Sequence, residues 1–416
     1  MALFSLVLLF VAVVLGFVKK MNIGLLCIAF SLVLGRIAGF SDKAIIAGFN
    51  YSLFMTLLGV TYLFALAQNN GCMTLAAKKV VALAGKRTFL VPIFVYLFCV
   101  FLSSIGPGCI PTMAIMLIFA MTLAAEMNIN PVMLTALCVL GASGGGVSPI
   151  APTGIIGVML SEEVGVHNVA MPMYINGLIS TTLYAIVVYF VFGGHKLKSQ
   201  NNVSFAELPA FNVKQWITIG GIFAMVVLVI GFGFNVGLTS FFIAMILSIL
   251  NVSNEADAVR SVPWGTLVLV GGVSVLMNLI IKLDGIKMLS VALASVMTPS
   301  TATPILSISA GILSWFSSTS GVVMPTFIPT IPTVVAEMQG NCNPVELITA
   351  LTMIAHTAGI SPMSTGGGLG LAAYCGAVKG GAEQQQKLFI QLFLTSACAV
   401  LFLSFMSYLG LFRWFI

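Results

Sequence analysis

Two stretches of the sequence, residues 103–153 and 317–368, resemble each other, and both interrupt apolar sequence with polar breaks rich in Gly and Pro. Three dipeptides recur at an offset of 213 or 214 residues: Ser103-Ser104 with Ser317-Ser318, Pro111-Thr112 with Pro325-Thr326, and Ser148-Pro149 with Ser361-Pro362. Broken backbone within a membrane is costly unless it lines a cavity or binds a ligand. Paired breaks in two halves of a chain therefore predict a binding site where the halves meet.

Composition places both stretches in a membrane. Of the 416 residues, 59% are hydrophobic and 7% are charged, whereas a soluble domain carries about 25% charged residues. The chain is expected to be an all-α polytopic membrane protein. Its net charge of +6 does not indicate nucleic-acid binding, because the basic residues lie in short loops. The first apolar run, residues 2–18, lacks a basic leader and a cleavage site, so it is expected to remain as the first helix.

Apolar runs of about 20 residues predict membrane spans. Residues 1–194 form a first repeat of five spans, and a polar linker, residues 195–215, separates it from a second repeat, residues 216–416. The predicted spans are 2–18, 22–40, 45–67, 131–160, 172–193, 216–234, 236–251, 263–281, 344–376 and 388–411. Of these, 131–160 and 344–376 are predicted to be broken helices. The other predicted elements are amphipathic helices at 71–87 and 284–298 and short-armed re-entrant hairpins at 88–127 and 302–338.

Five spans in each repeat give the two repeats opposite orientations in the membrane, so the repeats are predicted to be inverted. If Lys19-Lys20 is cytoplasmic, 12 of the 17 Lys and Arg residues lie inside, in agreement with the positive-inside rule. The inside set is Lys19, Lys20, Lys78, Lys79, Lys86, Arg87, Lys196, Lys198, Lys214, Arg260, Lys379 and Lys387. Both termini are then expected outside the cytoplasmic membrane, and the two hairpins enter from opposite sides and meet near the midplane.

The polar side chains near the breaks are hydroxyls, and the hairpin tips contain no Asp, Glu, Lys or Arg. Helices are expected to start near Pro111, Pro325, Pro362 and either Pro149 or Pro152, and such starts present N–H groups and a dipole that favour an anion. Hydroxyl and carbonyl oxygens are hard ligands suited to Na⁺. We therefore expect an anionic substrate carried with a cation. The hydroxyl residues are Ser103, Ser104, Ser143, Ser148, Thr153, Ser317, Ser318, Thr319, Ser320, Thr357, Ser361, Ser364 and Thr365.

Other chemistries have weaker support in the sequence. His356 is the only His deep in a predicted span and aligns with Ser143, so it offers a proton site or a substrate contact, or is a neutral His bonded to a carbonyl. Glu126 and Glu337 end the paired hairpin helices and are interpreted as interfacial or packing residues. The segment 141–144 matches the GxSG motif of rhomboid proteases, but a hydrolase built on Ser143 and His356 leaves the duplication unexplained. A passive channel is a further alternative, but it has weaker support because ion-selective pores usually show charged rings or carbonyl filters.

The N-terminal half resembles the dicarboxylate (malonate) carrier family of the ion transporter superfamily, especially residues 1–87 with the stretches VKKMNIGLLCIAF (18–30) and GVTYLFALAQNNG (59–71). The predicted architecture is similar to that of the divalent anion:sodium symporters. Those symporters carry a Ser-Asn-Thr triplet at each hairpin tip. The matching positions here are Ser103-Ser104-Ile105 and either Ser317-Ser318-Thr319 or Ser318-Thr319-Ser320, so the Asn is absent from both tips.

The resemblance implies two cation sites, a substrate between the hairpin tips, a homodimer and an elevator-type motion of the hairpins and broken helices. The implied cation ligands are Ser103, Ser104 and Gly106 with Gly144 and Gly145, and Ser318 and Thr319 with Ala358 and Gly359. The implied substrate residues are Ser104, Ser148, Thr153, Ser318, Thr319, Ser361, Ser364 and Thr365.

The predicted function is secondary active transport of a small carboxylate, a C3 or C4 dicarboxylate such as malonate or succinate, in symport with Na⁺. No enzyme activity, organic cofactor or nucleic-acid partner is expected. The alternatives are a H⁺-coupled carboxylate transporter and the membrane subunit of a binding-protein-dependent carboxylate transporter. An intramembrane serine protease and a channel are more remote.

Overall fold

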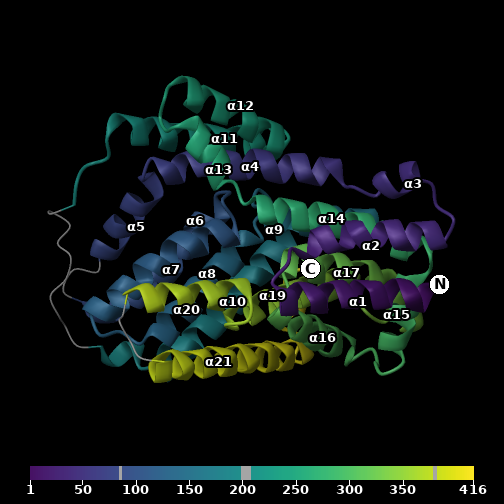
Figure 1. Cartoon of the computed structure of the whole chain (residues 1–416). Coiled ribbons are helices and arrows are strands. Elements are labelled where there is room, and N and C mark those ends of the chain that lie inside the picture. The colour runs from purple at the N-terminus through teal and green to yellow at the C-terminus, as the bar shows by residue number, and fades with distance from the viewer. Residues whose placement is uncertain (84–86, 198–207, 378–381) are drawn as a thin grey trace.

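The computed structural model describes residues 1–83, 87–197, 208–377 and 382–416, and in these ranges the chain forms helices and no strand (Figure 1). Lys86, Lys198 and Lys379, which were assigned to the cytoplasmic side, and linker residues 198–207 lie outside the described residues. The first-half helices are α1 (Ala2–Lys19), α2 (Ile23–Ile37), α3 (Asp42–Ile46), α4 (Tyr51–Asn69), α5 (Cys72–Ala82), α6 (Val91–Ser104), α7 (Cys109–Glu126), α8 (Pro131–Gly146), α9 (Pro152–Glu163) and α10 (Ala170–Val191). The second-half helices are α11 (Val213–Phe232), α12 (Val236–Ile249), α13 (Glu255–Ser261), α14 (Trp264–Lys282), α15 (Gly285–Ala294), α16 (Ala302–Phe316), α17 (Met324–Phe327), α18 (Ile331–Glu337), α19 (Pro344–Thr357), α20 (Thr365–Ala377) and α21 (Ala382–Tyr408).

Corresponding helices in the two halves begin with the same capping chemistry. The side chains of Asn22 and Asn235 accept hydrogen bonds from backbone N–H groups of α2 and α12 at 2.9 and 3.0 Å. Asn130 and Asn343 cap α8 and α19 in the same way, each directly before a Pro. Asn satisfies N–H groups that a helix start leaves free, and Pro at the first position has no N–H to satisfy. The repeated sequence pattern thus produces repeated helix starts.

Two helix pairs that join the halves cross at glycines. α2 packs on α14, and α4 packs on α12. A Cβ atom at Gly272 would overlap the backbone of Gly24, and a Cβ atom at Gly59 would overlap the carbonyl of Gly237. Small residues permit this close approach of membrane helices. Gly24 and Gly59 precede Gly237 and Gly272 by 213 residues, so the two crossings correspond under the offset of the sequence repeat.

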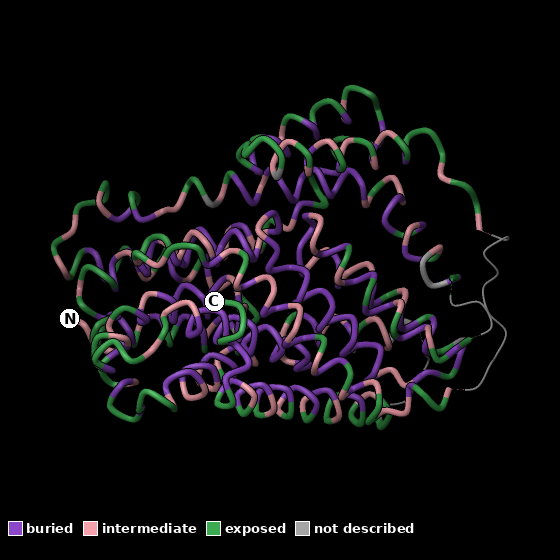
Figure 2. Tube along the Cα trace, turned by 180° about the vertical axis from the view of Figure 1, so that it is seen from behind, coloured by how far each residue is buried: buried purple, intermediate pink, exposed green. Residues whose placement is uncertain are grey.

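We divide the helices into two groups by their packing partners. The crossing group contains α1, α2, α4, α11, α12 and α14. The central group contains α6–α10 and α16–α21, in which α6, α7 and α10 pack on α8, and α16 and α21 pack on α19. α8 and α19 are buried over nearly their whole length, whereas α11, α12 and α21 each have one exposed and one buried face (Figure 2). The interrupted helices α8 and α19 therefore lie at the centre of the molecule.

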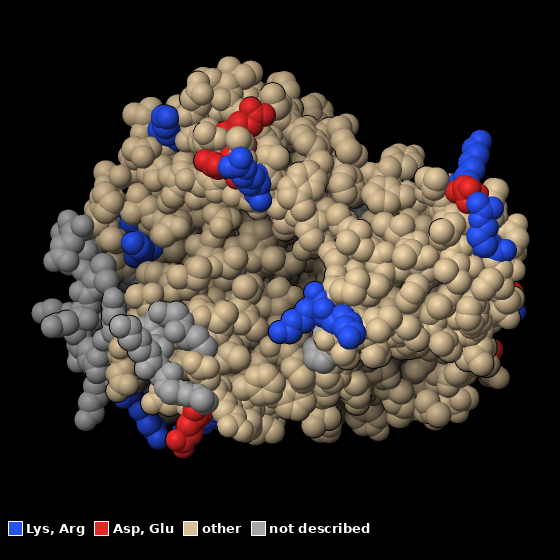
Figure 3. Space-filling view, viewed as in Figure 1, with Lys and Arg blue, Asp and Glu red and all other residues tan. Residues whose placement is uncertain are grey.

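The outer surface is apolar and carries few charges on the face drawn in Figure 3. Phe223 in α11, Phe242 in α12 and Leu401 in α21 are each more than 60% exposed. Among the described residues, four helical segments are long and apolar enough to cross a membrane, and ten further apolar helices are shorter. Exposed apolar surface of this extent is expected where lipid is the solvent. The chain is a multi-pass membrane protein.

Three predicted boundaries differ from the structure. The predicted span 45–67 begins as α3 and continues only after a turn as α4. The second arm of the segment 302–338 is a series of short helical pieces, because Pro325, Pro329 and Pro332 each remove a backbone donor. Pro362 does not start a helix, since α20 begins three residues later at Thr365.

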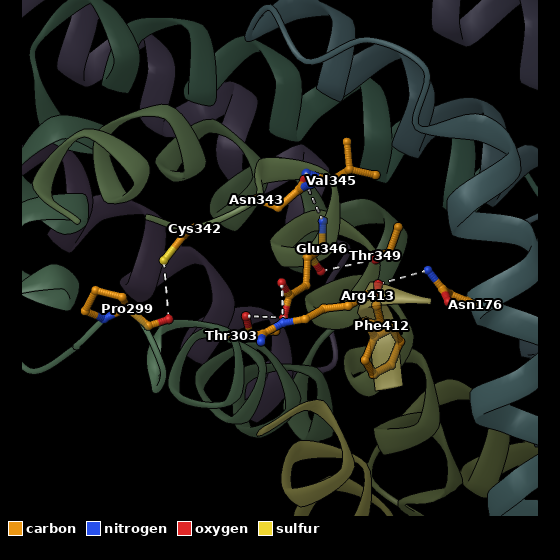
Figure 4. Close-up of polar contacts among 10 residues, drawn as sticks. All are labelled: Asn176, Pro299, Thr303, Cys342, Asn343, Val345, Glu346, Thr349, Phe412 and Arg413. Carbon is orange, nitrogen blue, oxygen red and sulfur yellow. Dashed lines mark hydrogen bonds and ion pairs between the residues drawn. The ribbon is translucent and has the colours of Figure 1, made fainter. Parts of the chain in front are cut away.

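The segment after α21 folds back onto the central group (Figure 4). Arg413 Nε lies 3.1 Å from each carboxylate oxygen of Glu346, whose side chain is 6% exposed. Thr303 Oγ1 donates to the same carboxylate at 3.1 Å. Asn176 Nδ2 in α10 donates to the Phe412 carbonyl at 3.3 Å. This segment therefore contacts α10 of the first half and α19 of the second.

Candidate functional site

The first tip is the short turn between α6 and α7. Gly106 and Gly108 adopt φ angles of 135° and 77°, which favour glycine. A Cβ atom at Gly106 would also overlap the Phe64 ring of α4, so the tip lies against the crossing group. Ser103 Oγ donates to the Ala142 carbonyl in α8 at 2.7 Å. The tip is thus bonded to one broken helix. Pro111 lies in the first turn of α7, as predicted.

The second tip makes the corresponding bond with a different residue from the one that sequence matching suggests. Ser314 Oγ donates to the Ala355 carbonyl in α19 at 2.7 Å, and Ala355 follows Ala142 by 213 residues. Hydrogen bonding therefore pairs Ser103 with Ser314, whereas the sequence match pairs it with Ser317. Ser314 precedes Pro325 by 11 residues and Ser103 precedes Pro111 by 8. Three additional residues therefore lie between Ser314 and Pro325, a segment that includes the π-helical turn Thr319–Val323.

Both broken helices restart beside these tips. α9 begins at Pro152, which settles the open choice between Pro149 and Pro152. Ser361 lies in the second break, where its Oγ accepts a hydrogen bond from the Met363 N–H at 3.3 Å. Thr153 and Thr365 lie in the first turns of α9 and α20. Helix starts of this kind present N–H groups that carry partial positive charge.

A cavity of about 50 Å³, here called the central pocket, lies where both tips and both breaks meet. It is lined by Cys109, Ile110, Met113, Ser143, Thr153, Ser318, Thr319, Ser320, His356, Gly359, Ser364, Thr365 and Gly366. None of these described residues is Asp, Glu, Lys or Arg. Seven of the predicted site residues are among them: Thr153, Ser318, Thr319, His356, Gly359, Ser364 and Thr365. A space of this size holds an ion or a water molecule rather than a dicarboxylate.

Ser143 and His356, which correspond under the 213-residue offset, both line the central pocket. Ser143 Oγ is buried and has no hydrogen-bond partner among the described residues. His356 Nδ1 lies 2.7 Å from the Thr352 carbonyl. Because a carbonyl oxygen only accepts, Nδ1 carries the proton, and Nε2 of the neutral ring is the lone-pair nitrogen. A hydroxyl and an imidazole nitrogen are therefore available to a ligand.

The first predicted cation set lies outside the central pocket. Ser104 Oγ donates to the Val100 carbonyl at 2.7 Å and accepts from Tyr174 Oη at 3.0 Å. A Cβ atom at Gly145 would lie 2.8 Å from Ser104 Oγ, and one at Gly146 would lie 3.0 Å from Ser103 Oγ. Gly144 instead faces Thr181 of α10. The structure brings Ser103, Ser104 and Gly145 together, while Gly144 and Gly106 face other helices.

The residues of the second predicted cation set lie closer to one another than those of the first. Ser318, Thr319 and Gly359 line the central pocket, and Thr319 Oγ1 donates to the Ala355 carbonyl at 3.2 Å. The Ala358 carbonyl accepts from Ser396 Oγ in α21 at 2.8 Å, so one of its lone pairs is engaged. Ser148 and Ser361 are buried in the two breaks but do not line the central pocket.

Cys109 and Met113 are pocket residues to which sequence reasoning gave no role. Cys109 is the first residue of α7, and its Sγ lies 3.7 Å from Thr153 Oγ1. Ser143 was recognised as a hydroxyl near a break but was not assigned to the substrate. Its alignment with His356 was the signal that could have placed it in the site.

The geometry of Ser143 also bears on the protease alternative. Ser143 and His356 do line one pocket, as that alternative requires. However, Ser143 Oγ lacks a hydrogen-bond partner in the described part of the chain, so the bond between nucleophile and base is not formed. A Ser–His hydrolase relies on that bond.

Comparisons with known proteins agree with the prediction that the chain is a transporter. Residues 1–146 match the family model described as the N-terminus of the dicarboxylate carrier protein MatC, which confirms the resemblance expected from segments 18–30 and 59–71. No curated protein matches the sequence. Among solved structures, the crystal structure of the YdaH transporter of Alcanivorax borkumensis is similar, with a TM-score of 0.60 over 96% of this chain and 97% of that chain, at 14% identity. The fold is therefore one that a known transporter adopts.

Proposed function

We propose that the protein is a secondary active transporter of small carboxylates and that it carries a dicarboxylate such as malonate or succinate together with Na⁺. The dicarboxylate-carrier match over residues 1–146 and the transporter fold support transport of a carboxylate rather than an enzymatic reaction. The observation that carries the proposal is the central pocket, where two tips and two helix breaks meet without a charged side chain. The hydroxyls and helix N–H groups at its edge can meet a carboxylate group of an anion, while the pocket itself has room for an ion or a water molecule.

Na⁺ is the proposed coupling ion because the pocket offers neutral oxygen ligands. Ser143, Thr153, Ser318 and Thr319 contribute hydroxyls, and the helix breaks add backbone carbonyls. Unwound backbone carbonyls hold Na⁺ in transporters with discontinuous helices. A volume of about 50 Å³ suits an ion of this size. The cation in turn supplies the positive charge that the pocket itself lacks.

The proposed transport cycle is an elevator motion between inverted repeats. The two glycine crossings correspond under the 213-residue offset, which supports a pair of repeats related by symmetry. The two hairpins are proposed to be re-entrant, and their tips meet the crossing group at Phe64 of α4 and at Leu269 of α14. We propose that the crossing group stays fixed, and forms the homodimer, while the central group slides along it with the bound ligands.

The test is uptake of labelled malonate and succinate by purified protein in liposomes, with an inward Na⁺ gradient compared with an inward H⁺ gradient. Uptake that depends on the Na⁺ gradient is the expected result, and it should occur without any added binding protein. Failure to transport either acid under both gradients would refute the substrate assignment.

One observation favours H⁺ coupling as a second candidate. His356 lines the central pocket and is the only His among its lining residues. A single imidazole at a transport site can load and release a proton. Uptake driven by the H⁺ gradient alone, and lost in His356→Gln, would select this candidate over Na⁺ coupling.

A further inference from the structure

A second cavity adjoins the central pocket and leads to the surface. This vestibule has a volume of about 590 Å³ and shares Ser318, Ser364 and Thr365 with the central pocket. Its other walls come from the end of α1 and the turn into α2, from Leu269 of α14, and from Phe316, Ser317 and Met363 of the central group. The central pocket is too small for a dicarboxylate, whereas the vestibule has ample room for one.

Lys20 is the one charged residue among the described residues that line the vestibule. It is exposed, and no Asp or Glu in the described ranges pairs with it. On the face drawn in Figure 3, basic side chains gather over the end of α1, beside a hollow. The positive charge is therefore free to act on an anion in the cavity.

The backbone holds Lys20 at this position. Lys20 directly follows α1 as its C-cap residue. It adopts a φ of 54°, and its N–H donates to the Gly16 carbonyl. Two residues later, Asn22 Nδ2 donates to the Gly265 carbonyl of α14 at 2.7 Å. The turn that carries Lys20 is thus bonded to the crossing group, whereas Ser318, Ser364 and Thr365 belong to the central group.

Residues of the second break can be reached from the vestibule, whereas those of the first break are buried. Ser318 and Ser364 are half-buried and Thr365 is exposed, so all three can be reached from the vestibule. Ser148 and Thr153, from the first break, are buried. Access to the start of α20 in this conformation therefore runs past Lys20.

The geometry points to the vestibule as the route between the site and the side of the membrane on which Lys20 lies, expected above to be the cytoplasm, with Lys20 as the residue that attracts the substrate anion there. This inference rests on the proposed function and adds a specificity-determining residue to it. A cleft lined by one sign of charge raises the local concentration of an oppositely charged ligand. A dicarboxylate carries two negative charges, so it gains more from Lys20 than a monocarboxylate does. This attraction weakens as salt shortens the Debye length from about 30 Å at 0.01 M to about 3 Å at 1 M.

The test is titration of purified, detergent-solubilised protein, in which both faces are accessible, with malonate at constant Na⁺ and at low and high ionic strength. The variants are Lys20→Gln and Lys20→Glu. The matched controls are Lys19→Gln and Lys19→Glu, because Lys19 is the exposed neighbour that does not line the vestibule. We expect Lys20→Glu to raise the Kd roughly three- to tenfold at low ionic strength. At high ionic strength its Kd should approach that of the unmodified protein, and the Lys19 variants should change the Kd clearly less than the Lys20 variants at low ionic strength.

Three outcomes would overturn the inference. If Lys20→Glu binds like the unmodified protein at low ionic strength, Lys20 does not attract the substrate, although the proposed function stands. If the Lys19 and Lys20 variants weaken binding equally, the effect is general surface charge and not the vestibule. If the unmodified protein binds neither malonate nor succinate, the proposed function itself fails and this inference fails with it.

Discussion

Replacing Gly272 with Ala is expected to destabilise the protein by forcing α2 and α14 apart. A Cβ atom at Gly272 would lie 2.5 Å from the carbonyl carbon of Gly24, whereas carbon atoms make ordinary contact at about 3.5 Å. The two helices must therefore separate by roughly 1 Å, and they cannot do so by rotating a side chain, because the obstacle is backbone. Overpacking of this kind costs about 2 kcal/mol.

The assay is a melting or denaturant curve of the purified protein in detergent, with Gly220→Ala as the matched control. Gly220 is an exposed residue of α11, and nothing lies within 4 Å of a Cβ atom placed there. Ala is the better helix former, so Gly220→Ala should be neutral or stabilising by up to about 1 kcal/mol. Gly24→Ala should resemble Gly272→Ala. The double variant should cost less than the sum of the two, because one separation of the helices relieves both overlaps.

The reasoning is refuted if Gly272→Ala and Gly220→Ala have the same stability. The corresponding pair supplies an independent check, because Gly59→Ala meets the Gly237 carbonyl in the α4–α12 crossing. A large effect at one crossing and none at the other would contradict the correspondence between the two.

Three further predictions concern the site and the segment after α21. Ser104→Ala and Ser318→Ala should each reduce liposome uptake while the amount of folded protein in the membrane is unchanged, and normal uptake by both would remove the hairpin tips from the site. Ser143→Ala should leave stability unchanged or raise it by up to about 1 kcal/mol, because it deletes a buried hydroxyl without a partner in the described chain. The same change should weaken substrate or Na⁺ binding, and unaltered titrations of both ligands would contradict a binding role. Arg413→Ala should lower the free energy of unfolding by about 1–2 kcal/mol, since it leaves the nearly buried Glu346 carboxylate with Thr303 while Arg413 itself is 53% exposed. A melting curve identical to that of the unmodified protein would show that solvent compensates for the lost pair.

The order of the helices was predictable because simple chemistry marks it in the sequence. Apolar runs, the paired Asn caps and Pro152 mark where helices begin, and these signals act within a few residues of the chain. The convergence of residues from both repeats, such as Thr153 and Thr365, was also foreseen, because breaks in membrane helices need a cavity.

The details that escaped prediction depend on contacts between distant residues. The pairing of Ser103 with Ser314 rather than with Ser317 reflects three additional residues in the second tip, which an alignment at a fixed offset cannot detect. Whether Ser143 lacks a partner, and whether Gly144 faces Thr181, depends on how α8 is rotated against its neighbours. No local signal in the sequence sets that rotation.

The attachment of Arg413 and Phe412 has a consequence for how the protein is made. Phe412 bonds to a residue 236 positions earlier in the chain, and Arg413 to one 67 positions earlier. While the ribosome is still synthesising α21, the Glu346 carboxylate has only the Thr303 hydroxyl and water to satisfy it. We expect the direct packing of α10 on α19 to gain these two polar links only after this segment has emerged from the ribosome.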